Sequence, residues 1–162
     1  MSKQEEDFLL VLEQHRGILF KIVNAYCKDE EDRKDLAQEI LIQLWSSIDR
    51  FDERVKFSTW MYRVSLNVAI SFHRKKNVRN TEVLDDSFLQ IAEDTSDQSE
   101  ELQLLNKFIH ELDDLNRALI ILYLDGNNHN EIAEVLSISK SNVGTKISRI
   151  KNLLRDKFKT ID

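Results

Sequence analysis

The chain of 162 residues contains no proline and only three glycines. Sheet-rich folds need these residues in their tight turns, whereas helices joined by polar loops do not. Apolar residues also recur at helical spacing along most of the chain, for example at Phe57, Trp60, Met61 and Val64. The sequence therefore predicts an all-α protein.

Charge is strongly segregated along the chain, although the net charge is only −6. Residues 54–81 hold seven basic residues and no Asp or Glu, whereas residues 82–101 hold eight acidic residues and no Lys or Arg. An acidic stretch rich in Ser, Thr and Gln is typical of a flexible linker. We therefore expect two small helical domains, residues 1–80 and 101–162, joined by a flexible acidic linker at residues 81–100.

Composition also bears on the class of protein. No apolar run approaches the roughly 20 residues needed to span a bilayer, and the charged N-terminus predicts no signal peptide. Cys27 is the only cysteine, so no internal disulfide can form, which fits a reducing cytoplasm. The four histidines show no metal-ligand spacing, and no Gly-rich phosphate loop occurs. We expect a cytoplasmic protein with no membrane insertion, no catalytic residue, no metal and no cofactor.

Three helices with apolar stripes are expected in the N-terminal domain. Their expected limits are residues 5–28, residues 32–48 and a third helix that is capped by Ser58 or Thr59 and continues to Lys76. Trp45 and Trp60 are expected in the core, where large rings bury the most area. His15 is expected to be packed or half-exposed rather than a ligand.

The second of these helices carries a separate polar stripe. Asp35, Gln38, Glu39 and Ile42 stand at offsets of three, four and seven residues, so they share one face. An apolar residue within a carboxylate and amide face suits a partner surface that is partly basic and partly apolar. An ordinary solvated face is the alternative interpretation.

The third helix combines an aromatic half with a basic and amide face. Arg63, Asn67 and Arg74 share one side of it, away from the apolar stripe. Such a surface suits a phosphate backbone and bases. The alternative is a solvated basic end of a helix.

The C-terminal region has the pattern of a helix-turn-helix. A short helix at residues 131–136 is followed by a three-residue break and by a longer helix from Lys140. Asn128 and Glu131 resemble a capping box before the short helix, and Gly126 suits a left-handed cap. The outward face of the longer helix carries hydrogen-bonding side chains: Ser141, Asn142, Thr145, Lys146 and Arg149. A helical hairpin inside an ordinary bundle could mimic this motif.

Taken together, these blocks resemble bacterial sigma factors. The residues that resemble sigma region 2 are Asp35-Leu36-Ala37-Gln38-Glu39, Leu44-Trp45, residues 57–64 and Asn67. The residues that resemble region 4 are residues 131–136 with Val143, Lys146, Ser148 and Arg149. The two blocks occur in the order found in that family, with no region 3 domain between them. The chain is therefore similar to the extracytoplasmic-function (ECF) group of the sigma-70 family.

The resemblance implies a protein that binds core RNA polymerase through the β′ and β subunits and directs it to promoter DNA. It implies promoter recognition, DNA melting and transcription initiation, and family members are often held by an anti-sigma factor. The implied core-polymerase-binding residues are Asp35, Gln38, Glu39 and Ile42. The implied −10 element residues are Phe51, Lys56, Arg63, Asn67, Arg74, Lys75 and Lys76. The implied −35 element residues are Ser141, Asn142, Thr145, Lys146 and Arg149.

Some positions depart from the family pattern. Leu66 and Gly144 stand where basic residues are frequent, and Asn142 stands where Thr is common. An alternative function is a conventional helix-turn-helix repressor or activator with an N-terminal protein-interaction domain. Such a regulator would not need the block from Asp35 to Asn67.

Overall fold

The computed structural model describes residues 3–80 and 99–159, and every regular element within these residues is a helix. The all-α prediction is therefore confirmed for this part of the chain. The chain divides into two compact units, residues 1–94 and 95–162. Most of the expected acidic linker falls outside the described residues, and the limits of the domains stay a prediction.

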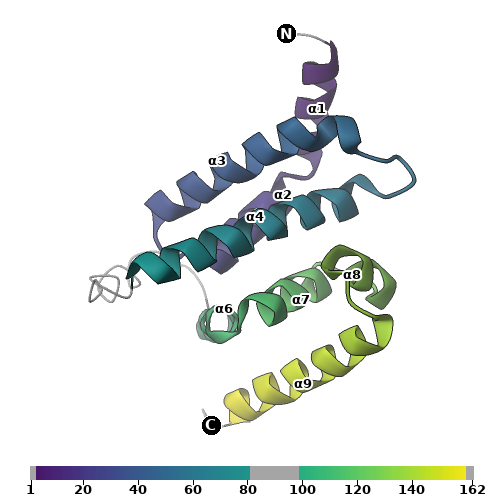
Figure 1. The fold of residues 1–162 in the computed structure, drawn as a ribbon. Helices are drawn as coiled ribbons and strands as arrows, with labels where there is room; N and C mark the ends of the chain where they lie inside the picture. Colours follow the sequence, from purple (N-terminus) through teal and green to yellow (C-terminus); the bar gives the residue numbers. More distant parts are fainter. Residues whose placement is uncertain (1–2, 81–98, 160–162) are drawn as a thin grey trace. The chain divides into compact units, whose positions relative to one another are not determined.

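The first unit is a group of helices around α4, which packs against both α2 and α3 (Figure 1). Its elements are α1 (Lys3–Gln14), α2 (Arg16–Tyr26), α3 (Glu30–Ser47), the short 3-10 helix η1 (Ile48–Arg50) and α4 (Phe57–Asn80). Ile22, Leu36, Leu44 and Met61 are fully buried between these helices. Leu66, where the family often has a basic residue, is only 2% exposed and therefore belongs to this core.

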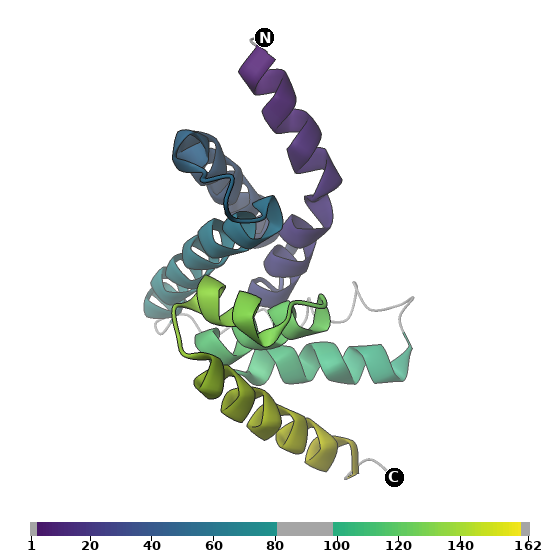
Figure 2. The same cartoon turned by 90° about the vertical axis from the view of Figure 1, so that its right-hand side faces the viewer.

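The single N-terminal helix expected over residues 5–28 is wrong, because it is broken at His15. The backbone of His15 has φ −115° and ψ 16°, and its Nδ1 donates to the Val11 carbonyl oxygen at 2.9 Å. Its half-buried ring lies 5.0 Å from the ring of Phe57. The break lets α2 pack in the helical group while α1 projects from it (Figure 2).

The limits of α3 and α4 also differ from the expected ones. Asp29 caps α3, its carboxylate accepting from the Asp32 amide at 2.7 Å, so this helix begins at Glu30. The helix α4 begins at Phe57, and the Lys56 carbonyl accepts from the Trp60 amide at 3.1 Å. Thr59 is 3% exposed and therefore packs in the core instead of capping the helix.

The second unit consists of two helical pairs, with α8 and α9 joined by a short turn (Figure 1). Its elements are α6 (Glu100–Glu111), α7 (Asp114–Leu124), α8 (His129–Leu136) and α9 (Lys140–Lys159). The expected capping box of Asn128 and Glu131 is confirmed, and Gly126 has the left-handed φ of +86°. Leu122, Ile132 and Val143 are fully buried between the helices.

A buried arginine joins the first pair of helices in this unit. Arg117 of α7 is 4% exposed, and its guanidinium donates to three carbonyl oxygens at the end of α6. The acceptors are Ile109 at 3.1 Å from Nε, and His110 and Leu112 at 2.7 and 2.8 Å from Nη2. The Ile109 carbonyl also accepts from the Leu112 amide at 3.2 Å. Arg117 thus adds donors to the last carbonyls of α6 and caps that helix from its neighbour.

Candidate functional site

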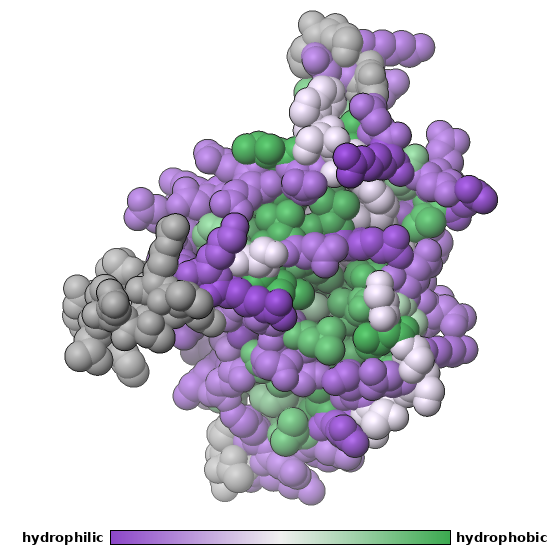
Figure 3. Space-filling model, in the orientation of Figure 1, coloured by the Kyte–Doolittle hydropathy of each residue, from purple (hydrophilic) through white to green (hydrophobic). Residues whose placement is uncertain are grey.

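The outer face of α3 presents the polar stripe expected from the sequence. Asp35, Gln38, Glu39 and Ile42 are all exposed, whereas Leu36, Ile40 and Leu44 on the opposite face are fully buried. Ile42 is 67% exposed, so it adds an apolar surface to this polar face instead of stabilising the core. Hydrophilic side chains cover α3 in the space-filling view, and apolar ones show between α3 and α4 (Figure 3).

Trp45 was expected in the core, and this prediction is wrong. It is 42% exposed, because it stands three residues after Ile42 and therefore shares the outer face of α3. The ring of Phe8 from α1 lies 5.1 Å away, edge to face, and partly covers it. Trp45 thus extends the apolar end of the stripe, and its offset from Ile42 was the signal that could have revealed it. We call Asp35, Gln38, Glu39, Ile42 and Trp45 the α3 face.

The loop between η1 and α4 is supported by three half-buried aromatic rings. Phe51 lies 5.6 Å from Phe57 and 5.3 Å from Trp60, measured between ring centroids. Trp60 is therefore only partly in the core. At the tip of the loop, backbone and side-chain hydrogen bonds from Arg54 lower the pKa of the Asp52 carboxyl. The rings thus give one side of this loop, which holds two acidic and two basic residues, an aromatic wall.

The basic and amide side chains of α4 do not all lie on one surface. Asn67, Arg74 and Lys75 are exposed, whereas Arg63 is half-buried. Lys76 forms an ion pair with Asp32 of α3, which turns it toward the group of helices. Arg63, Asn67 and Arg74, at offsets of four and seven residues, share one side of α4, whereas Lys75 and Lys76 point to other sides. Lys56, in the preceding loop, is exposed.

The C-terminal pair α8 and α9 has helix-turn-helix geometry. Ser137 adopts the left-handed conformation with φ 56°, and the Ile138 amide donates to the Ala133 carbonyl oxygen at 3.2 Å. Ser139 then caps α9 by accepting from the Asn142 amide at 3.0 Å. The turn is thus fixed by bonds within a few residues.

The outer face of α9 carries the expected hydrogen-bonding side chains. Ser141, Asn142, Thr145 and Arg149 are exposed, and Lys146 is half-buried. The Thr145 hydroxyl donates to the Ser141 carbonyl oxygen at 3.1 Å, which leaves its lone pairs available to a donor. This exposed row suits contacts with base edges and phosphates.

Comparison with known proteins decides the family. The family models Sigma-70 region 2 and Sigma-70, region 4 match residues 11–79 and 102–154. The ECF RNA polymerase sigma factor SigW of Bacillus subtilis (strain 168) is 30% identical, over 99% of this chain and 94% of the relative. The chain belongs to the ECF family of RNA polymerase sigma factors. SigX of the same organism is also 30% identical, over 93% of this chain and 83% of that relative.

Two solved structures share the fold of this sigma factor. RpoE in complex with the anti-sigma factor NepR from Bartonella quintana has a TM-score of 0.74 and 22% identity, over 95% of this chain and 98% of that one. CnrH in complex with the cytosolic domain of CnrY has a TM-score of 0.72 and 21% identity, over 98% and 91%. At these identities the likeness shows the fold alone.

Within the sigma factor's region 4 match, Gly144 lies beside His129, the first residue of α8. A side-chain carbon added at Gly144 would lie 3.8 Å from two ring atoms of His129, which is ordinary van der Waals contact. The half-buried His129 ring thus occupies the surface beside this glycine on the longer helix. No local pattern in the sequence indicated this contact.

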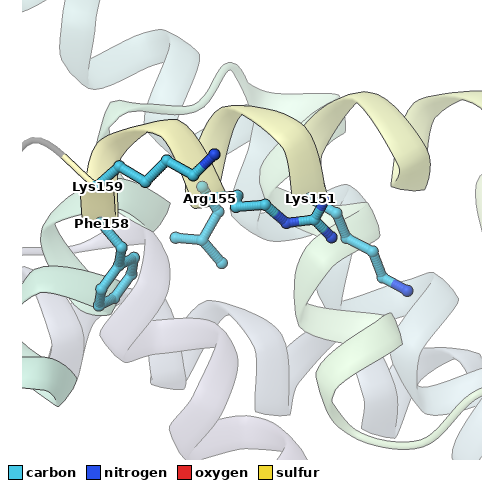
Figure 4. A pocket seen from close by; sticks show the side chains of 5 residues that line it. Lys151, Arg155, Phe158 and Lys159 are labelled. Atoms are coloured by element: carbon cyan, nitrogen blue, oxygen red, sulfur yellow. The ribbon is translucent and has the colours of Figure 1, made fainter.

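An open hollow of about 480 Å³ lies on the second half of α9, beyond the exposed row. Lys151, Leu154, Arg155, Phe158 and Lys159 line it, and four of them are labelled in Figure 4. These side chains offer neither a general base nor a metal ligand. Among the described residues, no group of three or more His, Cys, Asp or Glu could hold a metal ion.

No helix in the described part of the chain is both long and apolar enough to cross a membrane.

Proposed function

We propose that this sigma factor binds core RNA polymerase through the α3 face and directs it to promoter DNA. The observation that carries the proposal is the exposure of Ile42, at 67%, among exposed carboxylate and amide side chains. An interface that combines charge complementarity with an apolar centre gives both orientation and affinity. Trp45 adds a large ring to the same face, and such rings often dominate binding energy.

Melted −10 DNA is proposed to contact the loop before α4 and the exposed side of α4. Phe51 belongs to an aromatic wall, and Asn67 can donate and accept hydrogen bonds with a base edge. Lys56, Arg63, Arg74 and Lys75 supply positive charge for phosphates. Lys76 is less available to DNA phosphates, because it forms an ion pair with Asp32.

The −35 element is proposed to bind the outer row of α9 in its major groove. Ser141, Asn142 and Thr145 lie near the start of the helix, where base edges are usually contacted, and Lys146 and Arg149 suit phosphates. Gly144 removes a basic side chain from this surface. We therefore infer a −35 preference that differs from that of relatives with Lys or Arg at this position.

An anti-sigma factor as a partner and a location in the cytoplasm are also part of the proposed function. The structurally similar RpoE forms a complex with the anti-sigma factor NepR, which supports an anti-sigma factor as a further partner of this chain. Binding to core polymerase places the protein in the cytoplasm. Chemistry belongs to the polymerase, and this chain supplies binding energy and strand separation without catalytic activity of its own.

The test is binding of core RNA polymerase by the full chain, measured by gel filtration and by titration. The double substitution Asp35→Arg with Glu39→Arg should weaken binding about 30-fold or more, because it replaces two attractive charges by repulsive ones. Helicity, measured by circular dichroism, should not change, since both side chains are exposed. A matched control is Lys34→Gln, an exposed neighbour paired with Glu30.

Wild-type affinity in the double variant would remove the α3 face from the proposal. No binding of core polymerase by the wild-type chain would instead favour a conventional helix-turn-helix regulator. The two results are distinguishable because the second does not depend on any substitution.

A further inference from the structure

The outer face of α2 belongs to none of the binding surfaces proposed above. Arg16, Phe20 and Asn24 stand four residues apart and form one exposed row along the helix. Lys21 lies beside the row and Lys28 follows the helix, and both are exposed. No acidic residue occurs from Arg16 to Lys28. We call these five side chains the α2 row.

An aromatic ring stands at the centre of the α2 row. Phe20 is 48% exposed, whereas Ile18 and Ile22 on the opposite face of the helix are buried. The guanidinium carbon of Arg16 lies 5.1 Å from the centroid of the Phe20 ring, within the range of a cation–π contact. The row therefore presents positive charge and an aromatic surface at the same point.

Glu13 is the acidic side chain that pairs with Arg16. It accepts a hydrogen bond from Arg16 Nη1 at 2.9 Å, and the two side chains are 69% and 58% exposed. An ion pair this exposed contributes little to stability. A phosphate can therefore replace Glu13 as the partner of Arg16 at small cost.

The α2 row begins beside the aromatic wall of the proposed −10 surface. His15 directly precedes Arg16, and its ring lies 5.0 Å from Phe57, which in turn lies 5.6 Å from Phe51. At the other end of α2, the ring of Tyr26 lies 6.0 Å from that of His73 on α4. These contacts show that α2 runs alongside α4 in the same direction, starting from the loop that carries Phe51.

We propose that the α2 row binds single-stranded DNA and continues the strand path that begins at the proposed −10 surface. The inference rests on the proposed function for the source of the unpaired strand. The Phe20 ring can stack on any base, the basic side chains neutralise phosphates, and Asn24 offers a donor and an acceptor. A duplex has no unstacked base for Phe20, so the exposed ring favours a single strand.

The experiment measures binding of the full chain to a fluorescent oligothymidine of about 12 nucleotides, by anisotropy at low salt. Phe20→Ala should raise Kd about fivefold or more, because it removes a stacking surface. Arg16→Gln combined with Lys28→Gln should reduce the slope of log K against log salt by about 1.4, at about 0.7 per phosphate contact on a single strand.

Two substitutions outside the row serve as matched controls. Leu9→Ala removes an apolar side chain of α1 that is 49% exposed, close to the 48% of Phe20. Lys34→Gln removes an exposed cation that, like Arg16, forms an exposed ion pair with a nearby glutamate. Neither control should change Kd by more than about twofold, since exposed single charges and apolar residues outside a site contribute little.

No measurable binding by the wild-type chain, or equal Kd values for Phe20→Ala and Leu9→Ala, would overturn the proposal. The variant Asn67→Ala distinguishes a failure of the α2 row from a failure of the proposed −10 surface. If Asn67→Ala weakens binding and Phe20→Ala does not, the −10 surface stands and the α2 row is not part of it.

Vesicles containing phosphatidylglycerol test whether the α2 row binds an anionic membrane surface instead of DNA. Vesicle binding that Phe20→Ala abolishes, with unchanged oligothymidine binding, would assign the row to a membrane surface and also overturn the proposal.

Discussion

The start of α2 and the turn before α9 are defined in different ways. In the second unit, side chains cap the helices locally: Ser99 caps α6, Asp113 caps α7 and Asn128 caps α8. Asp29 caps α3 of the first unit in the same way. By contrast, α2 begins after His15 with no side-chain cap, and the His15 ring packs on Phe57 of α4. Local polar bonds therefore shape the helix-turn-helix, whereas an aromatic contact between distant segments lies where α2 begins.

This difference suits the two proposed tasks. A recognition helix must hold its side chains in fixed register with base edges, and short-range caps fix the turn before it. A surface for an unpaired strand needs aromatic rings that are packed yet partly exposed, as Phe51, Phe57 and Trp60 are. The comparison can be tested by substitutions that affect one unit and spare the other.

Arg117→Met is expected to have the largest effect. It keeps most of the buried volume but removes three hydrogen bonds and leaves the His110 and Leu112 carbonyls without the guanidinium donor, so the second unit should lose about 3 kcal/mol. Hydrogen exchange should accelerate in α6 to α9 and remain unchanged in α2 to α4. The control is Lys107→Met, at an exposed position of α6. Equal protection in both variants would show that the buried guanidinium is not what holds this pair of helices.

Phe57→Ala tests the first unit in the same way. Phe57 contacts the rings of His15, Phe51 and Trp60, and it is half-buried, so we expect a loss of about 2 kcal/mol. Hydrogen exchange should accelerate at the junction of α1 and α2 and at the start of α4. Phe57→Leu retains apolar area and should cost less. If both variants match the wild type, the rings do not determine these helix ends.

Asn128→Ala is expected to have the smallest effect of the three. Loss of the capping box should cost about 1 kcal/mol and should be confined to the second unit. Asn130→Ala, in the first turn of the same helix, makes a suitable comparison because its side chain is exposed. Thermal unfolding followed by circular dichroism would detect the difference between them. Identical melting temperatures would mean that the cap is dispensable and that packing alone fixes α8.

The same contrast explains how much the sequence predicted. The capping box and Gly126 were predictable, because their signals lie within a few residues of each other. The break at His15 was not predicted, and its ring contacts Phe57 in another helix. The exposure of Trp45 was missed, although its offset from Ile42 indicated it. Periodicity predicted the exposure of Asp35, Gln38, Glu39 and Ile42. It does not indicate the ion pair of Lys76 with Asp32, which is far away in the sequence.

Transcription in vitro with core RNA polymerase tests most directly whether this chain directs the polymerase to promoters. Core polymerase would be supplied with bacterial genomic DNA fragments, with and without the full chain, and the 5′ ends of the transcripts would be sequenced. A sigma factor predicts a defined set of start sites that appears only with the chain and that shares upstream −35 and −10 sequences. Start sites that are the same with and without the chain, while the chain still binds DNA, would contradict the account.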